Sequence, residues 1–179
     1  MPYNERGILT VISGFAGAGK GTIVKKLMED YPDCYSLSIS ATTRQPRKGE
    51  VDGREYFFLS IDEFEERIKA GKFIEYANYV GNYYGTPKEY VNKQLSANKN
   101  VILEIEVQGA LNVKKIFDDA LLLFVTPPSA SILKERLTGR GTETPDVVDK
   151  RMKRAYEESR LIDNYDYLLI NDDLNLVIR

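Results

Sequence analysis

The sequence is poor in the residues that most metal centres and hydrolytic triads require. Its 179 residues include no histidine and a single cysteine, Cys34. The lack of histidine excludes catalytic triads built on imidazole and zinc sites with imidazole ligands. One cysteine can form neither an intrachain disulfide nor a cysteine-rich metal cluster, which suits a reducing compartment.

Long apolar runs are also missing. None approaches the roughly 18 residues of a membrane-spanning helix, and the N-terminus lacks the apolar core of a signal peptide. The net charge is −2 and the pI is about 5.4, so no broad basic surface is expected. We therefore expect a cytoplasmic protein that binds neither nucleic acid nor membrane, and in which any anion site is local.

The composition, 42% hydrophobic and 29% charged, is typical of a globular protein, and the length predicts one compact domain. A helical pattern that starts at Thr22 ends at Pro32, and further helical patterns separate the later apolar runs. This alternation predicts an α/β fold with helices on both faces of a parallel sheet. The runs expected to form buried strands are Gly7–Ser13, Tyr35–Ile39, Val101–Ile105, Leu121–Val125 and Tyr167–Ile170.

Residues 40–86 have a different pattern and predict a small antiparallel insertion. Aromatic, strand-prone segments cover Tyr56–Leu59, Phe73–Val80 and Tyr83–Tyr84, with a hairpin signal at Gly81-Asn82. Ser60 and Glu63 predict a capping box at the start of a helix. Thr86 to Glu89 repeat that pattern, with Pro87 expected at the first helical position.

Residues 130–161 contain two helical patterns, which are broken at Gly139-Arg140-Gly141 and at Pro145. Acidic residues are interspersed with the basic ones, so a solvated helical pair is the simplest interpretation. The alternative is a mobile lid that brings arginines to a phosphate. The basic residues are Lys134, Arg136, Arg140, Lys150, Arg151, Lys153, Arg154 and Arg160.

The strongest motif is the glycine-rich stretch Gly14–Thr22, GFAGAGKGT, between a predicted strand and a predicted helix. Inward-facing backbone N–H groups, the helix N-terminus and Lys20 suit a chain of phosphates. A glycine-rich turn with a surface lysine is the alternative. Gly21 stands where the common pattern has the Ser or Thr that holds Mg²⁺, so we expect nucleotide oxygens, water and acids elsewhere to hold the metal. The motif indicates a nucleotide but does not identify a reaction.

A second anion site is indicated by Arg44 and Arg47, which are separated by a proline and so do not suit a regular helix. Both guanidinium groups can converge on one phosphate, although an exposed basic turn is an equally simple interpretation.

Along nearly its whole length the sequence resembles the guanylate kinase family. Beside the glycine-rich loop, the matching stretches are SISATTRQPRKGEVDGREYFF, FIEYANYVGNYYGTP, LEIEVQGA, LFVTPPS, ERLTGRGTETP, KRM and IND, in the family's order and spacing. The resemblance implies transfer of the γ-phosphoryl group of MgATP to GMP or dGMP. It also implies an α/β P-loop three-layer fold: a core with a mostly parallel five-stranded sheet, a small antiparallel GMP-binding insertion and a helical lid. The core would comprise residues 1–39, 87–129 and 162–179, the insertion 40–86 and the lid 130–161.

The resemblance also assigns the donor side. Asn171 and Asp172 would approach adenine, and Glu104 would lie near Mg²⁺, with water between the carboxylate and the metal. The groups implied in catalysis are Lys20, Arg47, Arg140 and Arg151. The residues implied in ATP binding are Gly14, Phe15, Ala16, Gly17, Ala18, Gly19, Lys20, Gly21, Thr22, Arg136, Asn171 and Asp172.

For the acceptor, the resemblance implies that GMP phosphate is held by Arg44, Arg47, Tyr56 and Tyr84, and guanine by Ser40, Glu75, Thr86 and Glu106. A carboxylate only accepts hydrogen bonds, so Glu75 suits the two adjacent donors of guanine. Without the family resemblance, Glu75 would be interpreted as a surface carboxylate. Glu104 and Glu106 share one face of a predicted strand. The family often has Asp at the position of Glu106.

Two rival functions stay open. Guanylate-kinase-like modules of scaffold proteins bind phosphorylated partners without catalysis, but their phosphate loops are typically degraded, whereas Lys20 and the loop glycines are present here. A different acceptor, such as a phosphorylated sugar, is the second; Ser40, Glu75 and Thr86 favour a base. The sequence is compatible with a monomer or a homo-oligomer.

Overall fold

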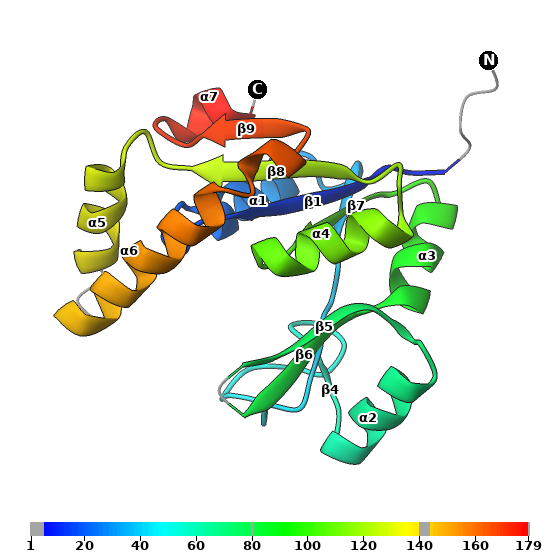
Figure 1. The fold of residues 1–179 in the computed structure, drawn as a ribbon. Helices are drawn as coiled ribbons and strands as arrows, with labels where there is room; N and C mark the ends of the chain where they lie inside the picture. The colour runs from blue at the N-terminus through cyan, green and yellow to red at the C-terminus, as the bar shows by residue number, and fades with distance from the viewer. Residues whose placement is uncertain (1–5, 80, 140–143, 179) are drawn as a thin grey trace.

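The core of the protein is a five-stranded parallel sheet. The computed structural model describes residues 6–79, 81–139 and 144–178. The strand order is β2-β7-β1-β8-β9, and every neighbouring pair is parallel, as the sequence predicts (Figure 1). The strands are β1 (Leu9–Gly14), β2 (Tyr35–Leu37), β7 (Asn100–Glu104), β8 (Leu121–Thr126) and β9 (Tyr167–Ile170).

Alternate residues of the central strands form two apolar clusters, one on each face of the sheet. Ile12 packs on the side of α1 (Lys20–Asp30) with Ile23 and Val24. Val11 packs on the opposite side, with α3 (Lys88–Ser96) and α4 (Val107–Ile116). The sheet is therefore covered on both faces, which confirms the three-layer α/β fold.

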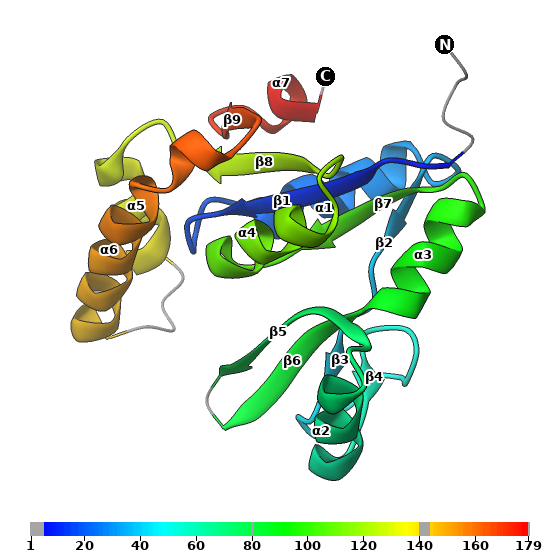
Figure 2. The ribbon, with the colours of Figure 1, turned by 45° about the vertical axis from the view of Figure 1, so that its right-hand side comes forward.

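The insertion forms a second, four-stranded sheet, whose strand order is β4-β3-β6-β5 (Figure 2). The β3–β6 and β6–β5 pairs are antiparallel as expected, but β4 pairs parallel to β3, so the sheet is mixed. Phe64 stacks between Phe73 and Tyr83, with ring centroids 4.3 and 5.1 Å away. The elements are β3 (Ala41–Thr42), β4 (Phe57–Phe58), α2 (Ile61–Lys69), β5 (Phe73–Tyr79) and β6 (Asn82–Pro87).

One of the two predicted capping boxes is present. Ser60 accepts from the backbone of Glu63, whose carboxylate accepts from the backbone of Ser60. The second prediction is wrong: Pro87 is the N-cap of α3, not its first residue, and no side chain of the described residues caps that helix. The hydroxyl that would have capped it, on Thr86, is directed to Glu75 instead.

Helices α5, α6 and α7, a 3-10 turn and the last strand follow β8 in the described part of the chain. Helices α5 (Ala130–Thr138) and α6 (Pro145–Ser159) pack against each other beside the core (Figure 1). A 3-10 turn (Ile162–Asn164) leads to β9, which is followed by α7 (Leu174–Ile178). The expectation of buried strands is wrong at both edges of the sheet: β2 has no buried residue, and the side chains of β9 are largely exposed. None of the helices described is both long and apolar enough to span a bilayer.

Candidate functional site

The glycine-rich loop connects the end of β1 to the start of α1. Gly14 is the last residue of β1 and Lys20 the first of α1. The Lys20 ammonium donates to the carbonyl oxygens of Gly14, at 2.8 Å, and Phe15, at 3.2 Å. Gly14 has φ +137°, and a Cβ there would lie 2.1 Å from the carbonyl oxygen of Val125. Only glycine fits, and the loop therefore stays close to β8.

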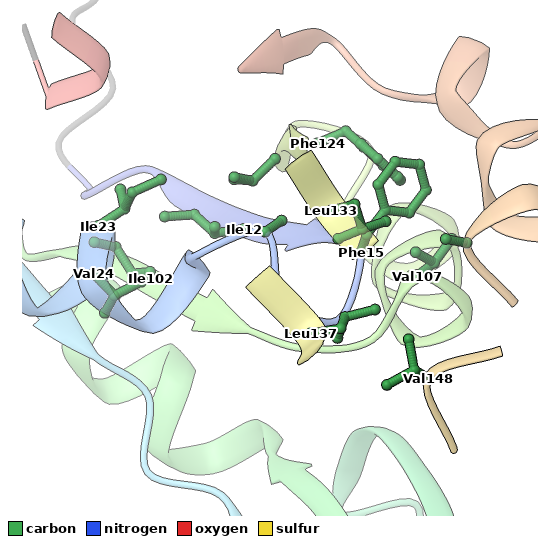
Figure 3. Close-up of a cluster of buried hydrophobic side chains, with 13 residues drawn as sticks. Ile12, Phe15, Ile23, Val24, Ile102, Val107, Phe124, Leu133, Leu137 and Val148 are labelled. Carbon is green, nitrogen blue, oxygen red and sulfur yellow. The ribbon is translucent and has the colours of Figure 1, made fainter. Parts of the chain in front are cut away.

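The apolar side of the loop is anchored in the core. Phe15 is buried and meets Phe124 edge-on, with ring centroids 5.0 Å apart. Figure 3 shows Phe15 beside Leu133 and Leu137 of α5, in the same cluster as Val148 of α6. The loop and the two helices expected to form a lid thus share one apolar cluster.

Asn171 fixes the loop from the other side. It is 7% exposed, and its side-chain amide donates to the carbonyl oxygen of Ala18 at 2.8 Å. Its own backbone carbonyl oxygen accepts from the Arg136 guanidinium at 2.9 Å. The structure therefore brings Asn171 and Arg136 to the loop, while the neighbouring Asp172 is exposed. The side-chain amide of Asn171 braces the loop, a role that the sequence did not indicate.

Glu104 ends β7 next to the loop. A Cβ built on Gly21 would lie 3.6 Å from Glu104 Oε1, so the carboxylate faces the position where the common pattern has a hydroxyl. Desolvation raises the pKa of Glu104; Lys20 opposes the rise and Glu106 adds to it. Within the described residues, no three acids converge as a complete metal site. The donor set fits a Mg²⁺ ion that takes its other ligands from nucleotide oxygens and water.

Three residues expected at the acceptor phosphate come together in the insertion. The Arg44 guanidinium lies 5.4 Å from the ring centroid of Tyr56, and the Tyr56 and Tyr84 ring centroids are 6.1 Å apart. Glu50 accepts from Arg44 Nη2 at 2.8 Å and from the backbone N–H of Arg47 at 2.6 Å. The hydrogen bond to Glu50 raises the pKa of Arg44, and the same bond lowers the pKa of Glu50. The sequence placed Glu50 only within a matching stretch and indicated no role for it.

Glu75 lies on β5, between β6 and α4. Thr86 Oγ1 donates to Glu75 Oε1 at 2.6 Å. A Cβ built on Gly109 would lie 3.1 Å from Glu75 Oε2, so this glycine leaves room for the carboxylate. Burial raises the pKa of Glu75, and the Thr86 hydrogen bonds oppose that rise. Glu75 is therefore a half-buried carboxylate that accepts a hydrogen bond, and this replaces the surface alternative. Ser40 directly precedes β3, where its carbonyl oxygen accepts from Phe57 N at 2.9 Å.

Glu106 is the N-cap residue of α4, the helix that contains Gly109. Its carboxylate accepts from Arg154 Nη2 on α6 at 2.7 Å, and Arg154 Nε donates to Glu158 at 2.8 Å. Both acids expected to hold the base therefore lie at the N-terminal end of α4. Arg151 is a half-buried residue of α6. Arg140 lies outside the described residues.

Comparison with known proteins matches one family throughout. The profile of the family described as "Guanylate kinase" matches residues 6–179. Proteins named guanylate kinase from Bacillus cereus and Bacillus anthracis are each 52% identical over 173 residues, covering 97% of this chain and 84% of the relative. The crystal structure of guanylate kinase from Anaplasma phagocytophilum is similar with a TM-score of 0.72 and 29% identity, over 97% of this chain and 81% of that one.

Proposed function

This chain belongs to the guanylate kinase family of nucleoside monophosphate kinases, and we propose that it transfers the γ-phosphoryl group of MgATP to GMP and dGMP, forming ADP and GDP or dGDP. One observation carries the choice of acceptor: the half-buried Glu75 carboxylate, which is held by Thr86 and lies in the same insertion as Arg44, Tyr56 and Tyr84. A base-binding carboxylate and a phosphate site on one insertion suit a nucleoside monophosphate.

On the donor side, we assign the triphosphate of ATP to the loop from Gly14 to Thr22. Lys20 exchanges its bonds to loop carbonyls for bonds to terminal phosphate oxygens, and the start of α1 adds its N–H groups. Asn171 contacts the same loop and Arg136 contacts Asn171, with Asp172 next in the sequence. Adenine binds beside them.

Mg²⁺, when bound, would neutralise charge on the β- and γ-phosphates. Glu104 would hold it through water, because its carboxylate is close to Gly21, which offers no hydroxyl. The Glu104 carboxylate at the end of β7 would thus compensate for the hydroxyl that Gly21 lacks.

For the acceptor, Arg44 and Arg47 neutralise the GMP phosphate so that its oxygen can approach the donor, and Tyr56 and Tyr84 help to hold it. Glu75 accepts from the two adjacent guanine donors, with Glu106 as the second acid. Because Thr86 gives its hydrogen to Glu75, the Ser40 hydroxyl supplies the donor to the guanine oxygen. Adenine would place a ring-nitrogen lone pair against Glu75, which disfavours AMP.

Closure completes the site. The GMP-binding insertion, residues 40–86, and the lid, residues 130–161, move over the core and exclude water from the transferring group. Arg151, and Arg140 by the family's pattern, then meet the charge that develops between the two nucleotides. No histidine base is needed, because the acceptor phosphate is already ionised at neutral pH.

The rival functions predict different assays. A scaffold-type module would bind a phosphorylated partner without turnover, and a sugar kinase would ignore GMP. ADP release should be measured in a coupled assay with GMP, dGMP, AMP, or no acceptor. We expect rapid release with GMP, substantial release with dGMP, and little with the other two; ADP release that does not depend on GMP would reject the proposal.

The enzyme acts in the cytoplasm, as a monomer or a homo-oligomer.

A further inference from the structure

Arg154 connects helix α6 to the start of α4. One guanidinium nitrogen, Nη2, donates to Glu106 Oε2 at 2.7 Å, and another, Nε, donates to Glu158 Oε1 at 2.8 Å. Glu158 lies four residues further along the same helix, whereas Glu106 is 48 residues away in sequence. The arginine is therefore a bridge from the lid helices to one of the acids proposed to bind guanine.

Glu106 has little else to orient it. Its side chain is 66% exposed and makes no capping hydrogen bond within the described chain, although the residue is the N-cap of α4. A glutamate side chain has three torsions, and an exposed one samples many rotamers. Among the described residues, Arg154 supplies the hydrogen bond that restricts this carboxylate.

Arg154 is itself well supported. Glu158 is 9% exposed, and Ala155, the residue after Arg154, is buried in the cluster that includes Phe15. Desolvation raises the pKa of Glu158, and its hydrogen bond with Arg154 opposes the rise. A guanidinium bound to a buried carboxylate on a packed helix offers a defined position from which to hold a mobile partner.

We propose that Arg154 is a positioning residue for the acceptor base: it holds Glu106 Oε2 so that the carboxylate presents its other oxygen to the N–H donors of guanine. This inference rests on the proposed function, because it requires Glu106 to contact the base. It adds a lid-helix residue to those that determine GMP affinity.

The test is the kinetics of Arg154→Ala. Exposed ion pairs contribute modestly, so we expect the KM for GMP to rise about two- to fivefold. The kcat and the KM for ATP should stay within about twofold of the wild type, because a positioning role acts on acceptor binding and not on the donor. Arg154→Lys should recover part of the loss. The matched control is Lys153→Ala, which removes an exposed positive charge from the neighbouring position of α6.

A double-mutant cycle isolates the pair. In a Glu106→Gln background, Arg154→Ala should cause no further rise in the KM for GMP, because the charged partner is gone. The inference would be overturned if Arg154→Ala left the KM for GMP unchanged, or if it raised that KM equally in the wild-type and Glu106→Gln backgrounds. The proposed function would stand in either case, as long as the wild-type protein phosphorylates GMP. A wild-type protein that does not phosphorylate GMP would overturn both.

Discussion

The Thr86 hydroxyl donates to Glu75 Oε1 at 2.6 Å, joining β6 to β5 at a half-buried carboxylate. Burying a carboxylate is unfavourable unless hydrogen bonds compensate. The hydroxyl and the backbone N–H of Thr86 compensate only in part, since the pKa of Glu75 is still raised. In the folded protein the Glu75 carboxylate can therefore accept more hydrogen bonds than Thr86 donates, and guanine has two adjacent N–H donors to supply them.

Glu75→Gln is predicted to stabilise the protein at high pH. Because the folded-state pKa of Glu75 lies above its unfolded value, ionisation destabilises the folded state, and this cost grows as pH rises through the folded pKa. We therefore expect Glu75→Gln to raise the Tm at pH 8, by an increment that shrinks toward pH 4, where the wild-type carboxyl is largely protonated in both states. Thermal melts of both proteins without nucleotide, from pH 4 to pH 8, measure this. An increment that is constant or grows toward low pH would contradict it.

The same substitution separates binding from stability. Glu75→Gln replaces one acceptor oxygen by a donor, so we expect weaker GMP use, with ATP binding largely retained. Titrations with GMP and ATP test the two sites separately. Equal loss of both affinities would indicate misfolding and not a base-specific role.

Gly109→Ala is predicted to weaken GMP binding without touching the nucleotide. Its Cβ would lie 3.1 Å from Glu75 Oε2, so the carboxylate must shift by a few tenths of an ångström. We expect the KM for GMP to rise several-fold, about the effect of a misplaced binding group, with an unchanged KM for ATP. A KM for GMP equal to that of the wild type would show that the carboxylate adapts.

The control for Gly109→Ala must not strain the backbone. Gly71→Ala would have room for its Cβ, because no described atom lies within 4 Å of it. It is nevertheless unsuitable, because φ of Gly71 is +63° and alanine would strain the backbone there. Ala97→Ser, at the C-cap of α3, is a mild substitution of an exposed residue that is assigned to neither nucleotide site. We expect this variant to keep the wild-type KM for both nucleotides.

Glu104→Gln is predicted to raise the Mg²⁺ concentration needed for half-maximal activity. The amide keeps the shape of the carboxylate next to Gly21 but loses its charge, which is what attracts a hydrated divalent cation. Mg²⁺ titrations at saturating ATP and GMP measure the shift. If the variant and the wild type have the same Mg²⁺ dependence, Glu104 does not contribute to the metal site.

Removal of either of two arginines is predicted to slow turnover. We expect Arg47→Ala, and separately Arg140→Ala, to lower the rate of phosphoryl transfer by at least ~100-fold. Arg47→Ala removes a positive charge beside the acceptor phosphate, and Arg140→Ala removes one beside the phosphoryl group that is transferred. Circular dichroism and thermal melts should show both variants folded. Near-normal turnover in both would remove these residues from the mechanism.

The sequence predicted the fold well because its signals were local and mutually consistent. The apolar run before Gly14 and the helical pattern after Lys20 are β1 and α1, and the Ser60–Glu63 capping box is present. The burial of β9 was misjudged, because Tyr167–Ile170 is apolar in composition but pairs only on one side. Sheet order depends on long-range pairing, which a strand's own composition does not report.

The site was predicted less evenly. The motifs identified the loop and Arg44, the family resemblance added Tyr56 and Tyr84, and the structure brings these last three residues together. The contacts of Thr86 with Glu75 and of Arg154 with Glu106 could not be read from spacing, because each joins residues of separate elements. The local pattern favoured Thr86 as a helix cap, but its hydroxyl binds the half-buried Glu75 instead, since an unpaired carboxylate withdrawn from water is costlier than an uncapped helix end.

The most direct test of the account follows the phosphoryl group itself. Purified protein should be incubated with Mg²⁺, ATP labelled in the γ-phosphoryl group, and either GMP or AMP. We predict that the label appears in the β-phosphoryl group of GDP, in proportion to the ADP formed, and that AMP accepts little of it. Label released as inorganic phosphate, or retained in ATP while GMP stays unphosphorylated, would contradict the claim that two nucleotides are joined end to end at this site.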